Sequence, residues 1–147
     1  MLGGGARAVT QGPGQLLTAS TPTTAGWVAK SKDHIQSSPG AVISYVISMP
    51  NTRLPGLNVP LRSRINSACI DNVTGYRQRV LADTTFTEVV TGAGADTTYS
   101  GWGRMLTDVF PRPTVDPGLV LAESKDHGFA DAGGQTCARY VSLSLAL

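Results

Sequence analysis

The chain has 147 residues, of which 41% are hydrophobic and 15% are charged, and its formal net charge is +2. This length suits a single domain that buries a core without the help of metals. The small net charge gives no electrostatic reason to expect a nucleic-acid partner. Because the sequence has neither a bilayer-spanning apolar run nor a signal-peptide pattern at its start, we expect a soluble protein, with no membrane partner, that is made in the cytoplasm.

Turn-forming residues interrupt the chain at close spacing. The 17 glycines and 9 prolines favour short strands joined by turns over helices. The sequence therefore predicts an all-β fold, a single jelly-roll-like sandwich of about eight strands.

Residues 1–24 consist mainly of Gly, Thr, Ser, Gln and Pro. Such a composition buries too little apolar surface to offset the entropy lost on ordering. We therefore expect a flexible N-terminal arm, followed by a β-sandwich or jelly-roll domain over residues 25–147. The arm either stays mobile or becomes ordered by adding along an exposed sheet edge of a partner.

A six-residue segment occurs twice, from Ala29 to His34 and again from Ala122 to His127, with one difference at its second position. Each copy follows an apolar stretch and precedes a turn-rich loop and a second strand. We interpret residues 26–49 and 119–145 as a duplicated β-hairpin in a pseudosymmetric sandwich. Strand alternation predicts that one set of side chains from each second strand faces the core: Ile43, Tyr45, Ile47 and Met49, and Val141, Leu143, Leu145 and Leu147.

Between the two copies, strand patterns cover residues 61–70, 76–82 and 84–90, and a turn covers residues 71–75. Residues 91–96, which include Gly92 and Gly94, are expected to form a loop, and residues 97–110 another strand segment. Without a secretory signal, the two cysteines, Cys69 and Cys137, are expected to be buried free thiols.

Arginines alternate on two of these segments, so that each segment carries its pair on one face. If the two strands pair, they form a basic patch that could grip carboxylates of a partner, although a plain solvated face is the alternative. Two proline-dense connections, 50–60 and 111–118, are expected to be stiff, either as contact loops or as rigid crossovers. The candidate partner contacts are therefore Arg62, Arg64, Arg77, Arg79, Pro55 and Pro113.

The repeated segment supplies the strongest candidate site. We interpret Asp33 and Asp126, which end their strands before loops, as acceptors for loop amides. The whole structural turn motif comprises Ser31, Lys32, Asp33, His34, Ser124, Lys125, Asp126 and His127. Two imidazoles and two carboxylates would also suit a divalent metal, but alternation turns neighbouring Asp and His side chains to opposite faces. We therefore predict no metal, no cofactor and, since no catalytic motif occurs, no enzyme.

The unit Trp27-Val28-Ala29-x-Ser31-Lys32-Asp33-His34, with its Ser-Pro-Gly loop and the strand through Tyr45, resembles segments of tailed-phage head decoration proteins, also called cement proteins. The resemblance implies a structural virion protein with a jelly-roll or related β fold. Such a protein binds the major capsid protein on the outside of the bacteriophage capsid and reinforces the shell, as a homo-oligomer.

Two other functions stay open at this point. One is a receptor- or glycan-binding β domain of a phage fibre, which should show an exposed aromatic platform. The other is a metal-dependent enzyme, in which Asp33, His34, Asp126 and His127 should converge.

Overall fold

The computed structural model describes residues 1–12, 14–34, 36–49, 56, 60–73, 78–82, 87–101, 103–112, 119–130 and 133–145. These residues contain ten strands and no helix, which confirms the all-β prediction. The strands are β1 (Gly3–Thr10), β2 (Gln15–Thr23), β3 (Gly26–Asp33), β4 (Gly40–Ile47), β5 (Leu61–Asp71), β6 (Gln78–Ala82), β7 (Val89–Thr97), β8 (Arg104–Arg112), β9 (Leu119–Asp126) and β10 (Gln135–Leu145).

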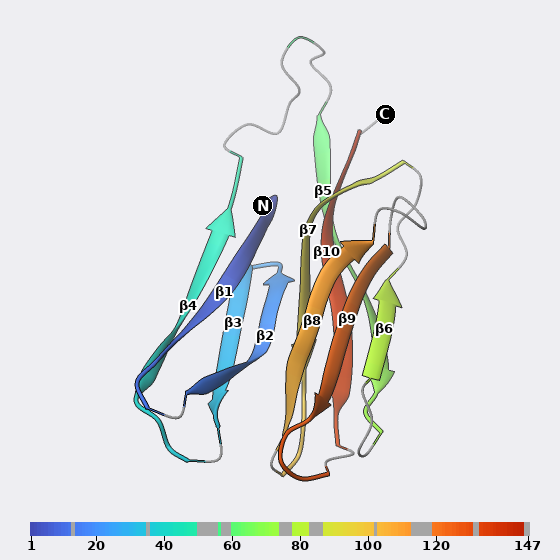
Figure 1. Ribbon diagram of the computed structural model, residues 1–147. Coiled ribbons are helices and arrows are strands. Elements are labelled where there is room, and N and C mark those ends of the chain that lie inside the picture. The colour runs from blue at the N-terminus through green and yellow to red at the C-terminus, as the bar shows by residue number, and fades with distance from the viewer. Residues whose placement is uncertain are drawn as a thin grey trace.

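The strands form three antiparallel sheets, arranged as a two-layer sandwich (Figure 1). One layer is a five-stranded sheet in the order β3-β2-β7-β10-β5. The other layer consists of the β1–β4 pair, which packs on β2 and β3, and the sheet β6-β9-β8, which packs on β7, β10 and β5. The jelly-roll connectivity stays a prediction.

The hydrophobic core lies between the sheet β6-β9-β8 and the five-stranded sheet. Its centre is made of small side chains packed around one tyrosine, all with almost no exposed surface: Ala95, Val120, Ala122, Ala138 and Tyr140. The interior of this sandwich is therefore concentrated on the C-terminal side of the molecule.

The ladder registers show that the repeat is longer than six residues. In the β2–β3 hairpin Gln15 lies opposite Asp33, and in the β8–β9 hairpin Arg104 lies opposite Asp126. Both hairpins carry a β-bulge three residues further on, between Leu17 and Ala19 in one and between Leu106 and Asp108 in the other. Because a bulge inserts an unpaired residue at a defined place, its repetition indicates equivalent backbones.

The equivalence extends to the flanking strands. Gly3 of β1 pairs with Ile47 of β4, and Gly92 of β7 pairs with Val141 of β10. A Gly-x-Gly turn joins β1 to β2 and β7 to β8, and all four of its glycines have positive φ. We call β1–β4 the N-terminal half and β7–β10 the C-terminal half.

The interpretation of residues 26–49 and 119–145 as hairpins was wrong. β3 pairs with β2 while β4 pairs with β1, and β9 pairs with β8 and β6 while β10 pairs with β7 and β5. In both copies the loop after the motif crosses from one layer to the other, so its two strands join different sheets. The repeat itself is real, but its unit is a four-strand half-sandwich.

β5 and β6 belong to neither half. β5 pairs with the outer edge of β10 and β6 with the outer edge of β9. Because β5 and β6 lie in different layers, they form a β-arch, which we call the middle arch. It extends both layers of the C-terminal half, and among the described residues no strand occupies the matching edges of β3 and β4.

The flexible arm was also a wrong prediction, because residues 3–10 and 15–23 form β1 and β2. Their stability comes from backbone ladders and small side chains rather than from large apolar groups. Thr18, Ala19 and Thr21 of β2 are at most 5% exposed. With β1 and β2 added to the roughly eight strands predicted, the described residues form ten strands.

Residues 91–96, expected as a loop, lie within β7. A Cβ added to Gly92 would stand 2.7 Å from the Cα of Gly3, and one added to Gly94 would stand 2.5 Å from the carbonyl oxygen of Ser20. These glycines therefore permit a close approach of backbones rather than a turn.

The two cysteines are joined in a disulfide, contrary to the expected free thiols. Cys69 lies directly opposite Cys137 in the β5–β10 ladder, with 4.1 Å between their Cα atoms. The sequence could not indicate this pairing because the two residues come together only through the strand order. The bond ties the middle arch to the C-terminal half.

The predicted core face of β10 was wrong, because the core cluster takes Ala138 and Tyr140 from the alternate face. Val141 of the predicted face has no exposed surface, but Leu145 is exposed; Leu147 lies outside the described residues. On β4 the prediction was wrong: Ile43, Tyr45, Ile47 and Met49 are all exposed. Among the described strands, only β1 pairs with β4.

The packing of β1 gives a stability test at Gly4. A Cβ at this position would lie 2.3 Å from the carbonyl oxygen of Tyr45 and 2.4 Å from the Trp27 ring, whereas one at Gly5 would meet nothing within 4 Å. We expect Gly4→Ala to lower the free energy of unfolding by about 1–3 kcal/mol through overpacking. Gly5→Ala is the matched control and should change it little. Denaturant titration checks this, and equal effects of the two substitutions would contradict the described contact.

Candidate assembly interface

The first copy of the motif forms a hydrogen-bonded corner around Gln15. The Gln15 side chain accepts a hydrogen bond from the Ser31 hydroxyl (2.8 Å) and donates to the Ser38 carbonyl oxygen (3.2 Å) and to the Asp33 carboxylate (3.5 Å). The Ser38 amide also donates to Asp33 (3.3 Å). A loop amide therefore does bind Asp33, as the motif predicts.

The second copy uses the same positions with a different facing residue. Arg104, which has no exposed surface, donates from Nη1 to the Asp126 carboxylate (2.6 Å) and from Nε to the Ser124 hydroxyl (3.3 Å). Its Nη1 also donates to the Val73 carbonyl oxygen (3.1 Å) at the end of β5. This corner therefore holds the middle arch as well as its own β8–β9 hairpin.

The two corners meet at the same end of the sandwich. The rings of His34 and His127 lie 4.5 Å apart between centroids. Their backbone amides make equivalent hydrogen bonds, from His34 to the Gly14 carbonyl oxygen and from His127 to that of Gly103. Contact between equivalent residues is what an approximate two-fold axis between the halves produces.

The motif residues do not assemble as a metal site would. The histidine rings come together, but Asp33 and Asp126 bind within their own corners. No group of three or more potential metal-ligating side chains occurs in the described part of the chain. The remaining members, Lys32 and Lys125, surround the histidines, and the Lys32 ammonium lies 5.4 Å from the centre of the Tyr99 ring.

This surrounding positive charge affects the titration of His127. Its pKa is lowered from 6.5 by burial first, and then by Lys32, His34 and Lys125. The folded protein therefore binds a proton at His127 less readily than the unfolded chain does. As the pH falls below 6.5, the unfolded chain becomes protonated first, and this group reduces the stability of the fold.

The predicted basic patch does not form by strand pairing, because β5 pairs with β10 and β6 pairs with β9. Arg62 and Arg64 are exposed on β5. The Nη1 atom of Arg64 lies 3.9 Å from Oε1 of Glu88. Arg77, Pro55 and Pro113 lie outside the described residues, as does the side chain of Arg79.

The most conspicuous surface feature is β4, in which every residue is exposed. Its ladder with β1 is the only one that β4 makes among the described strands. Large apolar side chains point to both faces, with exposed fractions of 37–59%: Val42, Ile43, Tyr45, Val46 and Ile47. An apolar edge strand of this kind is a template for pairing with another chain.

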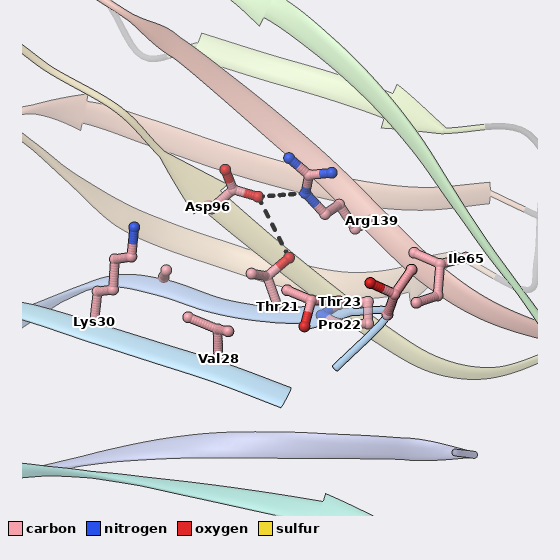
Figure 2. Close-up of a pocket in the computed structure, with 10 residues that line it drawn as sticks. Thr21, Pro22, Thr23, Val28, Lys30, Ile65, Asp96 and Arg139 are labelled. Atoms are coloured by element: carbon pink, nitrogen blue, oxygen red, sulfur yellow. Dashed lines mark hydrogen bonds and ion pairs between the residues drawn. The ribbon is translucent and has the colours of Figure 1, made fainter. Parts of the chain in front are cut away.

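A groove of about 540 Å³ with mixed polar and apolar lining lies on the other side of the β2–β3 hairpin (Figure 2). Arg139 Nε and the Thr21 hydroxyl both donate to the Asp96 carboxylate, at 2.6 and 3.3 Å. Figure 2 shows Lys30 and Ile65 on either side of this ion pair. The charges of Asp96 and Arg139 at the centre of the groove neutralise each other. β4 is therefore the stronger candidate for an interface with a partner.

Three comparisons with known proteins found no family model, no curated protein and no solved structure that matches this chain. Among the described residues, no helix has the length and apolar character needed to cross a membrane.

The residues that sequence reasoning missed are Gln15 and Arg104, the partners of the two motif copies. A weaker repeat at constant spacing could have located them. Gly3-x-Gly5-Ala6, Gly12-x-Gly14, Leu17-Thr18 and Pro22 return as Gly92-x-Gly94-Ala95, Gly101-x-Gly103, Leu106-Thr107 and Pro111.

Arg104 should matter more than its counterpart Gln15. Arg104→Met leaves the buried corner and the Val73 carbonyl oxygen without their donor, so we expect a loss of about 3–5 kcal/mol in unfolding free energy. Gln15→Met removes hydrogen bonds of an uncharged, partly exposed side chain, of which the one to the Asp33 carboxylate is long and exposed, and should cost about 1 kcal/mol. Chemical denaturation of both variants measures the two losses in unfolding free energy. A larger loss from Gln15→Met than from Arg104→Met would contradict the prediction.

The charge environment of His127 can be tested directly by NMR titration. We expect its pKa to lie below 6.5 and to rise in Lys32→Gln, which removes the largest coulombic cause. Lys30→Gln, on the same strand but outside this cluster, should leave the pKa unchanged. An equal rise in both variants would show that net charge, rather than the local contact, sets the shift.

Proposed function

We propose that the chain is a structural virion protein that binds the outside of a phage capsid shell and reinforces it. In this proposal it acts as a decoration protein, forms homo-oligomers, has a jelly-roll-like arrangement and contacts the major capsid protein. It works through protein contacts rather than through chemistry on a substrate.

The observation that carries the proposal is the open edge of β4. The exposed fractions of Tyr45, Val46 and Ile47 are 49, 56 and 59%. Monomeric proteins rarely leave a contiguous apolar patch uncovered, and natural edge strands are usually protected by charge, proline or a bulge. β4 carries none of these over Gly40–Ile47. A strand with this character is suited to a protein interface.

Assembly through such an edge fits the energetics of a protein that reinforces a shell in many copies. Strand pairing provides main-chain hydrogen bonds, and apolar burial adds roughly 25 cal/mol per Å². A modest contact per copy becomes strong when many copies bind one particle at once. Arg62 and Arg64, exposed on β5, offer further contacts to carboxylates of the shell.

The test is the copy number of the protein on purified phage particles, measured by quantitative mass spectrometry. We expect a fixed, high ratio to the major capsid protein. Ile43→Lys, which puts a charge on β4, should lower occupancy after mild heating by about tenfold. Val89→Lys, the same kind of change at a strand residue that is 67% exposed, should retain it. Absence of the wild-type protein from the particles would refute the proposal.

A further inference from the structure

Equivalent strands of the two halves differ sharply in exposure. Val42, Val46 and Ile47 of β4 are 40, 56 and 59% exposed. Their equivalents on β10, by the shared register, are Thr136, Tyr140 and Val141, which are 0, 2 and 0% exposed. The same backbone position is therefore interior in one half and surface in the other.

The middle arch accounts for the difference. In the C-terminal half β5 extends the layer of β10 and β6 extends the layer of β9. In the N-terminal half the matching edges belong to β4 and β3, and no described strand pairs with them. The N-terminal half therefore lacks one strand in each layer.

The arch of another copy is a poor candidate for this place. The Cys69–Cys137 disulfide and the Arg104–Val73 hydrogen bond attach the arch to its own C-terminal half. Moreover, Thr136 donates to Asn72 of the arch (2.7 Å), whereas its equivalent on β4 is Val42, which has no hydroxyl group. The N-terminal half lacks the side chains that recognise the arch.

We propose that β4 pairs with β4 of a second copy of this chain, antiparallel about a two-fold axis. The two β1–β4 pairs then form one four-stranded sheet, and the same axis brings the two β3 edges together in the layer below. The result is a sandwich that continues across two molecules.

Two observations favour an identical partner. First, β4 has no charged residue, so self-pairing brings no like charges together. A two-fold axis perpendicular to β4 makes it antiparallel to its own copy, which satisfies both free β4 edges at once. Second, the N-terminal half already associates with the similar C-terminal half within the chain, since His34 meets His127 and Gly3 meets Gly92.

This inference rests on the proposed function insofar as both use β4 as a protein interface. The test uses the purified full-length chain without particles, so the two can fail separately. Sedimentation velocity over a range of concentrations should show a dimer of the wild type. Ile43→Lys should raise the dissociation constant by about a hundredfold, because it places like charges near the axis and removes apolar contact. Val89→Lys should dimerise as the wild type does.

Hydrogen exchange locates the interface and guards against a folding defect. The amides within residues 40–47 that point away from β1 should be protected in the wild type and in Val89→Lys but not in Ile43→Lys. The β4 amides that donate to β1, and those of β9 and β10, should stay protected in all three. A wild type that is monomeric at every concentration, or a dimer that persists in Ile43→Lys, would overturn the inference. If the monomer still binds particles through Ile43, the proposed function stands and the occupant of β4 is the shell protein. If the chain forms a β4 dimer but is absent from particles, the inference stands and the proposed function is refuted.

Discussion

The pairing of the middle arch with one half-sandwich determines which surfaces of this molecule are closed. A strand edge carries backbone donors and acceptors that must bind either another strand or water. β5 and β6 satisfy the edges of β10 and β9, and the core forms beneath them. Among the described strands, one such arch serves two similar halves, and none pairs with the outer edges of β3 and β4.

Side chains at equivalent positions explain why the arch selects the C-terminal half. Arg104 is long enough to bind both its corner and the arch, whereas Gln15 in the same place binds the loop of its own half. Thr136 joins Ser124 and Asn72 in a buried hydrogen-bond network. Val42, its equivalent, can only contribute apolar surface. The differences between Arg104 and Gln15 and between Thr136 and Val42 thus distinguish the half that binds the arch from the half that does not.

The sequence predicted the strands of the repeated segment well, because alternation and turn residues are local signals. It did not predict β1 or β7, whose glycines allow backbones to approach so closely that large side chains are unnecessary. Nor could alternation show that β4 is exposed on both faces, since exposure depends on which strands lie beside it. The Cys69–Cys137 bond and the Gln15 and Arg104 corners likewise depend on strand order. The acceptor role of Asp33 followed from its position before a loop, and the structure agrees.

The meeting of His34 with His127, and of Gly3 with Gly92, has a consequence for how the two halves stay together. Two separate subunits with these contacts would associate only above a certain protein concentration. Because one backbone links the two halves, their association is intramolecular and independent of protein concentration. The molecule is therefore a covalently linked pair of half-sandwiches, in which the arch pairs with the outer edges of one half.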